Sequence, residues 1–314
     1  MESLSEIRVV DPVVTTLARG YRNAAFIFAM LFPYALVAQR AGKIIEFHAD
    51  DFVKRNVVRA PGGARQRVTV GHEGKPYATV QKALDGEVPV EHQEEAEAVL
   101  MIDMGQRASN SVMANVGLQI ELAAADLATD SANYDPTHVE TLAGASKWDA
   151  AGSDPADAVE NAKQKVAGAI AQKPNTLVIG SEVYSRLRNA PAVIERIKYV
   201  RGPEAQVTQD TLKAYFDVEH FAVGEARHGE PGAFVPAWGK FAVLAYTNTA
   251  SLAQGMMDRG EPSFGYTYRL NGYPMAEMPW YDRTCGAWVY PMTSEDTPVI
   301  AGRDAGYLFK DVVD

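Results

Sequence analysis

The sequence predicts an α+β protein in which strand-rich and helix-rich stretches follow one another along the chain. Three observations support this fold class. One apolar stripe recurs at helical spacing between residues 100 and 130, and short helices alternate with short strands between 154 and 250. The stretches 42–80 and 263–294 show the two-residue alternation that is typical of strands.

Residues 1–40 are too apolar to stay in water and too short to fold alone. Gly20 and Pro33 interrupt any long helix in this stretch. We therefore expect an N-terminal arm that packs against another surface. A helix packed on its own domain is the alternative that these residues leave open.

The next stretch predicts a long β-hairpin over residues 41–90. Ile45 and Phe47 in the first arm, and Val68 and Val70 in the second, alternate with polar neighbours, and Ala60-Pro61-Gly62-Gly63 supplies the turn. A two-stranded hairpin exposed on both faces is marginal in water. We therefore expect it to lie against a partner surface on its own chain or on another.

The charge changes sign abruptly along this hairpin. A basic cluster surrounds the turn: Lys54, Arg55, Arg59, Arg65 and Arg67. An acidic run follows it: Asp85, Glu87, Glu91, Glu94, Glu95 and Glu97. Such blocks are commonly solvated surface, and the sharper hypothesis is complementary contact between copies, with Arg55, Arg59, Arg65 and Arg67 facing Glu91, Glu94, Glu95 and Glu97.

The clearest helix follows the acidic run. Apolar side chains recur every four residues in the series Met104, Ala108, Val112, Val116 and Ile120, which predicts a long amphipathic helix. We expect Val112, Val116 and Ile120 to be buried beneath the later strands near Trp288. A polar loop is predicted from Asp130 to Gly152.

An α/β unit is predicted next. Asp154 and Pro155 have the residue types of a helix N-cap and first helical position. Residues 175–180 (Asn-Thr-Leu-Val-Ile-Gly) read as a short buried strand, and Ser181 is predicted to cap the helix that follows it. Two short helices and two further strands complete the unit, and Asn271-Gly272 marks a break between the long strands near the C-terminus.

Composition excludes several classes of protein. The 314 residues are 47% hydrophobic and 22% charged, an ordinary globular balance, and the net charge is −10. That sign disfavours a protein that grips nucleic acid through its phosphates. The run 24–38 is too short for a membrane span and has no signal-peptide flanks, so we expect a soluble protein with no membrane partner.

Cysteine and motif content argue against a catalytic or metal centre. The single cysteine, Cys285, excludes an intrachain disulfide and a cysteine-based zinc site, indicates a reducing compartment, and is expected to be buried in a strand. The histidines form no metal-binding pair, and no nucleophile elbow or phosphate loop occurs. We therefore expect no catalytic residue, no metal and no cofactor. The exception kept open is an α/β enzyme that binds a small anion near Ser181, where a strand meets a helix.

Four stretches in order resemble the major capsid proteins of tailed bacteriophages, which share the Hong Kong ninety-seven capsid fold. They are residues 141–166 (TLAGASKWDAAGSDPADAVENAKQKV), 174–200 (PNTLVIGSEVYSRLRNAPAVIERIKYV), 264–274 (FGYTYRLNGYP) and 305–313 (AGYLFKDVV). The Trp-Gly-Lys ahead of Phe241 also matches. The resemblance covers the chain from about Ala41 onward.

The resemblance implies the tailed-phage capsid fold with named parts. These are an N-terminal arm (1–40), an extended hairpin loop (41–90), a peripheral domain with a long spine helix (91–153), an axial α/β domain (154–262) and return strands of the peripheral domain (263–314). It implies a subunit that self-assembles as pentamers and hexamers into an icosahedral shell around double-stranded DNA. The chain would be a virion component assembled in the host cytoplasm.

The implied partners are copies of the chain, with scaffold, portal and decoration proteins as further candidates and DNA enclosed without sequence-specific binding. A fused scaffold and a covalent Lys–Asn crosslink are not expected. A shell of the same fold that encloses protein cargo is the second alternative.

Overall fold

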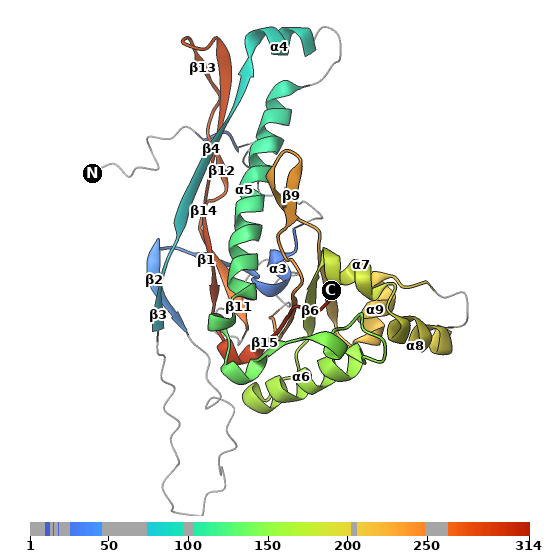
Figure 1. The fold of residues 1–314 in the computed structure, drawn as a ribbon. Coiled ribbons are helices and arrows are strands. Elements are labelled where there is room, and N and C mark those ends of the chain that lie inside the picture. The colour runs from blue at the N-terminus through green and yellow to red at the C-terminus, as the bar shows by residue number, and fades with distance from the viewer. Residues whose placement is uncertain are drawn as a thin grey trace, which may run out of the picture.

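The structure is a computed structural model and describes residues 10–12, 15, 18, 26–45, 74–96, 103–201, 206–248 and 263–314. Within these residues, a six-stranded sheet beside one long helix forms an elongated part, and a five-stranded sheet with four helices forms a broader part (Figure 1). The α+β class is confirmed. None of the described helices is long and apolar enough to cross a bilayer.

The elongated part is organised around one strand, β14 (Ala287–Ile300). The strand order is β1–β11–β14–β12, and β13 and β4 also pair with β14. The bounds are β1 Tyr34–Val37, β4 Val80–Pro89, β11 Gly265–Leu270, β12 Met275–Ala276 and β13 Trp280–Asp282. Strand β1 is parallel to β11, whereas β4, β11, β12 and β13 run antiparallel to β14.

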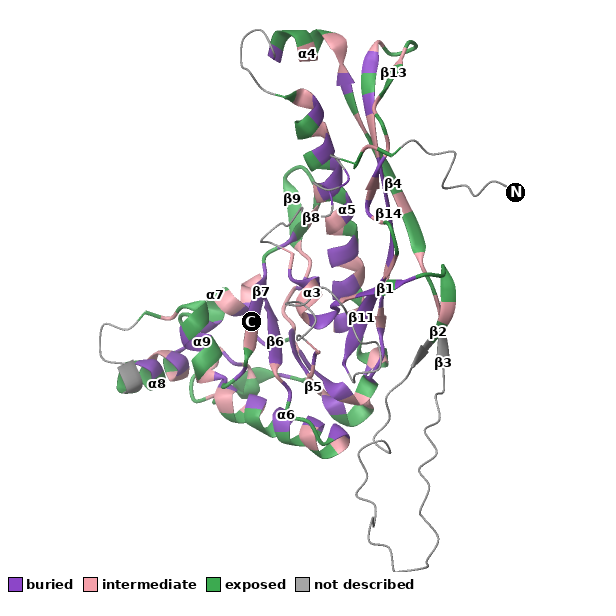
Figure 2. Cartoon of the chain, turned by 180° about the vertical axis from the view of Figure 1, so that it is seen from behind, coloured by how far each residue is buried: buried purple, intermediate pink, exposed green. Residues whose placement is uncertain are grey.

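The predicted long helix is α5 (Met104–Thr129), and it packs along β4 and β14 (Figures 1 and 2). Val112, Val116 and Ile120 are buried in one core with Met292 of β14, as the four-residue stripe predicts. The expected place of Trp288 is wrong. The ring of Tyr290 lies against Gly105 in the first turn of α5, so Trp288, two residues earlier in the strand, lies beyond the start of the helix and is half-exposed.

The broader part has the strand order β5–β15–β10–β6–β7. The strands are β5 Val139–Thr141, β6 Thr176–Gly180, β7 His220–Gly224, β10 Ala242–Ala245 and β15 Gly306–Lys310. The helices are α6 Pro155–Ile170, α7 Ser181–Leu187, α8 Pro191–Arg201 and α9 Gln209–Tyr215. Strands β6 and β10 are buried at every position, as strands inside a covered sheet should be.

The N-cap of α6 is the residue that the sequence predicts, whereas the N-cap of α7 is not. The carboxylate of Asp154 accepts the amides of Ala156 and Asp157, with Pro155 at the first helical position. Ser181 does not cap α7. Gly180 holds the N-cap position, and no described residue forms a hydrogen bond with the Ser181 hydroxyl.

The base of the predicted hairpin is present as β2 (Ala41–Ile45) paired antiparallel with β3 (Gly74–Ala78). Residues 46–73, which include Phe47, Val68, Val70 and the turn 60–63, lie outside the described residues. Strand β4 follows β3 after Thr79 and joins the large sheet.

The remaining elements are short. They are α3 (Phe28–Leu31), α4 (Val90–Glu95), a hairpin of β8 (Arg227–Glu230) and β9 (Ala233–Pro236), and the helical turns η3 Ser131–Asn133, η4 Pro136–His138, η5 Gly144–Ser146 and η6 Arg303–Ala305.

Two further expectations meet a different structure, and the described residues of the N-terminal arm bear on the alternative that was left open. Cys285 is exposed, because residues 283–286 form the turn between β13 and β14 with Gly286 at positive φ. The predicted loop 130–152 contains β5, which pairs with β15, and the buried Trp148. In the N-terminal arm, Thr15 and Ala18 are buried, and Thr15 exchanges hydrogen bonds with the backbone of Ala276 in its own chain.

The last strand, β15, pairs with β10 in the five-stranded sheet, although β14, the strand before it in sequence, belongs to the six-stranded sheet. The chain therefore returns to the α/β unit before it ends. The domain boundaries themselves stay a prediction.

Candidate assembly site

Two consecutive acidic residues of β14, Glu295 and Asp296, are buried in the middle of the large sheet. Successive side chains of a strand point to opposite faces, so each carboxylate has its own set of partners. Buried carboxylates need paired charges or several hydrogen bonds to offset the loss of water. Both residues have them.

Asp296 joins four strands. Its carboxylate accepts the Lys82 ammonium at 2.6 Å, the Arg269 guanidinium at 3.1 Å and the Ser294 hydroxyl at 2.7 Å. Arg269 also donates to the Tyr34 hydroxyl oxygen at 2.7 Å. Burial raises the pKa of Tyr34, and the adjacent Arg269 charge acts in the opposite direction. Side chains of β1, β4, β11 and β14 are thus tied to one point.

Glu295 fixes the base of the hairpin on the other face. Its Oε1 accepts Arg40 Nε at 2.9 Å and the Thr79 hydroxyl at 2.8 Å. Arg40 immediately precedes β2, and Thr79 immediately follows β3. The hydrogen bond to Glu295 raises the pKa of the Arg40 guanidinium. Both ends of the hairpin therefore meet one carboxylate of β14.

A third buried acid, Glu121 of α5, connects two distant segments and has no exposed surface. Its Oε2 accepts the amides of Ile27 at 3.0 Å and Phe28 at 2.9 Å, and its Oε1 accepts the Trp238 indole N–H at 2.6 Å. Burial raises the pKa of Glu121, and these three hydrogen bonds lower it in part. The start of α3 and the loop before β10 are both held to α5 by this side chain.

The predicted contact residues fall into two groups. Glu91, Glu94 and Glu95 lie on α4, and all three are exposed. Arg55, Arg59, Arg65, Arg67 and Glu97 lie outside the described residues. The described acidic residues of the predicted contact are thus exposed, and the pairing itself stays a prediction.

The far end of the large sheet carries an exposed aromatic patch. It consists of Met278, Trp280, Tyr281 and Trp288, each between 37% and 52% exposed. The Tyr281 and Trp288 rings lie 5.7 Å apart. Exposed clusters of large apolar side chains mark interaction surfaces.

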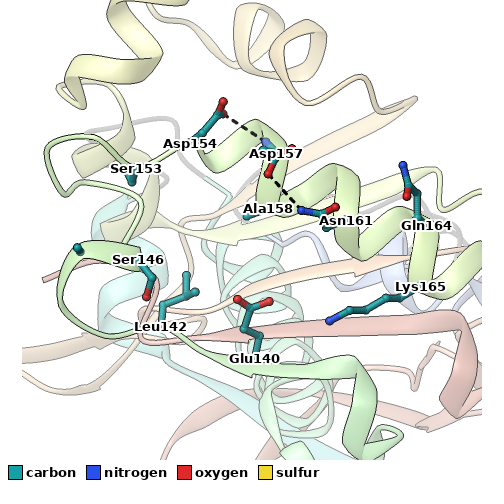
Figure 3. Close-up of a pocket in the computed structure, with 11 residues that line it drawn as sticks. Glu140, Leu142, Ser146, Ser153, Asp154, Asp157, Ala158, Asn161, Gln164 and Lys165 are labelled. Atoms are coloured by element: carbon teal, nitrogen blue, oxygen red, sulfur yellow. Dashed lines mark hydrogen bonds between the residues drawn. The ribbon is translucent and has the colours of Figure 1, made fainter.

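Two clefts in the broader part could in principle hold the small ligand of the enzyme alternative. The larger, about 790 Å³, lies between α6 and the β5–η5 segment (Figure 3). Its three acidic side chains already have partners: Asp154 accepts amides at the helix start, Asp157 accepts the Asn161 side-chain amide, and Glu140 accepts the Tyr307 hydroxyl at 2.9 Å. The smaller, about 450 Å³, contains Ser181, and its lining includes no histidine that could activate that hydroxyl. The described residues bring no three metal-binding side chains together.

Sequence analysis missed Glu121, Glu295 and Asp296. Their signal was present but faint. Glu121 follows Ile120 directly and so falls at the margin of the apolar stripe, and Glu295-Asp296 interrupts a strand that is otherwise apolar or hydroxylated. A charged residue that is fully buried is almost always paired, so a charge inside a buried pattern points to a partner elsewhere in the chain.

Comparisons with known proteins agree with this architecture. A family model for the phage major capsid protein E matches residues 130–280. The major capsid protein of Burkholderia phage BcepMu is 35% identical, over 99% of each chain. A phage-related protein from Bordetella bronchiseptica RB50 is 39% identical, with a TM-score of 0.82 over 97% of this chain and 98% of its own.

A more distant structure, the capsid of cyanophage P-SCSP1u, is 11% identical with a TM-score of 0.59, over 92% of this chain and 89% of its own, which is a likeness of fold alone. None of these comparisons favours the enzyme alternative at Ser181. Identity of 35% along nearly the whole length is a stronger statement than fold, because it includes the arm, the hairpin and both sheets. The chain belongs to the family of phage major capsid proteins.

Proposed function

We propose that this capsid protein assembles as pentamers and hexamers into an icosahedral shell that encloses double-stranded DNA. Self-association follows from its family. The observation that supports the finer statement is the hairpin base. Strands β2 and β3 pair only with each other among the described residues. Glu295 anchors the start of β2 through Arg40 and the end of β3 through Thr79. A two-stranded ribbon that is anchored only at its base, where Tyr77 of β3 also stacks on Tyr268 of β11, suits contact with a neighbouring subunit.

The proposed contact joins the basic cluster Arg55, Arg59, Arg65 and Arg67 of one copy to the acidic surface Glu91, Glu94, Glu95 and Glu97 of the next. Exposed ion pairs contribute only about 0–1 kcal/mol each. Repetition of the same contact around every capsomer makes the sum large. The exposed aromatic patch at the sheet end is a second candidate surface between copies.

Negative-stain microscopy of the expressed full chain tests the shell. Closed particles of uniform size are expected, and a small discrete oligomer would contradict the proposal. Reversal of Arg59 and Arg65 to Glu should abolish closed particles while circular dichroism stays unchanged. The matched control, Arg59→Lys with Arg65→Lys, keeps the charges and should assemble. Further reversal of Glu94 and Glu95 to Arg should restore particles to the Arg59→Glu, Arg65→Glu chain.

The content and partners of the shell form a separate part of the proposal. We expect assembly in the host cytoplasm, with scaffold, portal and decoration proteins as possible partners and DNA held without sequence-specific contacts. A net charge of −10 suits a container from which DNA must later leave. Nuclease-resistant DNA of genome length inside particles from infected cells is the expected result. Particles filled with protein would favour the protein-cargo alternative.

A further inference from the structure

The smaller cleft of the α/β unit, about 450 Å³, is lined by more cations than acids. It lies where α7, the start of β8, the loop before β10 and residue 314 meet, close to the C-terminal end marked in Figures 1 and 2. Its charged lining residues are Arg186, Arg227, Lys240, Glu182 and Asp314. The whole chain carries a net charge of −10, so this cleft goes against the overall balance and would attract an anion.

The acids of the cleft are partly neutralised within the chain. The Asp314 carboxylate accepts Lys147 Nζ at 2.6 Å. That contact lowers the pKa of the Asp314 carboxyl, and the charges of Lys240 and Arg186 act in the same direction. With Lys147 included, four cations face two carboxylates, which leaves an excess of two positive charges. No described residue forms a salt bridge with Arg186, Arg227 or Lys240, so all three can contact a ligand.

The cleft also contains a buried hydroxyl. The Ser181 Oγ is buried, and no described residue forms a hydrogen bond with it. Buried polar groups in proteins are almost always hydrogen-bonded, so this hydroxyl calls for a partner from outside the described chain. Ser185 adds a second hydroxyl to the lining. The cleft therefore offers guanidinium, ammonium and hydroxyl donors together.

Backbone packing fixes the elements that carry these donors. A Cβ on Gly180 would collide with the Gly239 carbonyl, so the loop that carries Lys240 lies directly on the end of β6. The Lys240 carbonyl in turn accepts the Val312 amide at 3.0 Å. Arg227 is the first residue of the paired strand β8. Donors on paired strands and a tightly packed loop form a site that is largely in place before a ligand arrives.

We propose that this cleft binds a terminal phosphoryl group, which may be carried by inorganic phosphate or by a small phosphate monoester. A guanidinium presents a planar fork that matches phosphate oxygens. A phosphate monoester has three acceptor oxygens and carries about −1.5 to −2 charges at neutral pH, which matches the excess on the lining. The inference goes beyond the proposed shell and does not depend on it.

Two other kinds of anion fit the cleft less well. A carboxylate has two oxygens and one charge, fewer than these donors can engage. A phosphodiester of duplex DNA likewise carries one charge, and it lies on the surface of a wide helix, out of reach of a buried hydroxyl such as that of Ser181. The site is one of binding and not of catalysis, since its lining includes no histidine that could activate Ser181.

Equilibrium dialysis of the full-length chain against radiolabelled inorganic phosphate tests the site. Saturable binding of one phosphate per chain is expected. Arg227→Gln and Lys240→Gln should each weaken it at least about tenfold. The matched control is Lys198→Gln, which removes an exposed cation of α8 outside the cleft and should leave binding unchanged. Absence of saturable binding, or equal losses from Lys240→Gln and Lys198→Gln, would overturn the inference.

The buried hydroxyl provides a second, independent variant. Ser181→Ala should weaken phosphate binding about tenfold, because a hydrogen bond to a charged group is lost. Its urea midpoint in phosphate-free buffer should equal that of the unaltered chain, since the hydroxyl has no partner among the described residues. In phosphate, the unaltered chain should be stabilised more than the variant, because a ligand stabilises the folded state in proportion to its affinity. Unchanged phosphate affinity in Ser181→Ala would place the anion elsewhere and refute the assignment.

Competition identifies the class of ligand. Glycerol phosphate, a monoester, should displace the labelled phosphate. Acetate, and a short DNA duplex without terminal phosphates, should not displace it at the same concentration. Displacement by acetate would make the ligand a carboxylate, and displacement by the duplex would make it a phosphodiester. Either result would overturn the terminal phosphoryl group.

Discussion

Replacing Glu121 by glutamine tests whether this single buried side chain holds the N-terminal segment and the α/β unit to α5. The carboxylate accepts three donors through two oxygens, with N···O distances of 2.6 to 3.0 Å. Glutamine has nearly the same volume but only one acceptor oxygen. Its NH₂ group must therefore face either the Trp238 indole N–H or the amides of Ile27 and Phe28, and a donor is left without an acceptor.

The size of the effect follows from these contacts. A hydrogen bond to a charged acceptor contributes about 1.5–3 kcal/mol, and an orphaned buried donor costs a similar amount. Part of this loss is recovered, because the neutral amide is cheaper to bury than the carboxylate whose pKa burial raises. We expect Glu121→Gln to lower the free energy of unfolding by about 1–3 kcal/mol at neutral pH. Glu121→Ala, which strands all three donors, should cost about 3–5 kcal/mol.

Urea unfolding of unassembled full-length chain, followed by tryptophan fluorescence and circular dichroism, measures this change. The matched control is Asp126→Asn, an acid-to-amide change at an exposed position of the same helix, which should stay within about 0.5 kcal/mol of the unaltered chain. Equal midpoints for Glu121→Gln and Asp126→Asn would refute the role given to Glu121.

The pH dependence has a definite sign. The folded pKa of Glu121 lies above its ordinary value of 4.5, so the folded state binds the proton more tightly than the unfolded state. Its contribution to stability is therefore fully present below about pH 4.5 and is lost as pH rises through the folded pKa. The stability difference between the unaltered chain and Glu121→Gln should grow on acidification, and a difference that shrinks would contradict the assignment.

Further substitutions test other parts of the structure. Asp296→Ala leaves the largely buried cations Lys82 and Arg269 without their carboxylate and should cost about 3–5 kcal/mol in urea unfolding. Val116→Asp places a carboxylate in the buried stripe of α5, at a cost of several kcal/mol, and should give insoluble or unassembled protein; a soluble, assembling variant would mean that the helix phase is wrong. Gly168→Ala, at an open and exposed position of α6, should raise the free energy of unfolding by about 0.5–1 kcal/mol. Gly180→Ala should instead destabilise, since a methyl group there would collide with the Gly239 carbonyl.

Local signals in the sequence predicted local structure well. The four-residue stripe located α5, the Asp154-Pro155 pair located the start of α6, and the Asn271-Gly272 pair marked the break after β11, where Gly272 has positive φ. In each case the residues that determine the conformation lie within a few positions of one another. The resemblance to phage capsid proteins was likewise carried by short stretches in a fixed order.

What sequence reasoning missed depends on distant partners. The two donors that Glu121 accepts lie far from it along the chain, Ile27 94 positions earlier and Trp238 117 positions later. Only the completed fold brings them to its carboxylate. Strand β5 is three residues long and exists because β15 lies beside it. The prediction that Cys285 is buried in a strand was wrong for a related reason. The alternation of apolar and polar residues around it reads as one strand, but the chain reverses direction there, between β13 and β14.

The attachment of the hairpin has a mechanical consequence. Strand β3 leads through Thr79 directly into β4, and β4 lies against β14 along ten residue pairs. A pull along the hairpin loads this ladder in shear, so that all its hydrogen bonds resist together rather than opening one after another. A sideways swing instead loads the contacts of Arg40 and Thr79 with their shared carboxylate, Glu295, and the stack of Tyr77 on Tyr268. The base of the hairpin should therefore resist tension along β4 more strongly than rotation about Glu295, and in the proposed shell this difference would let neighbouring copies meet at different angles.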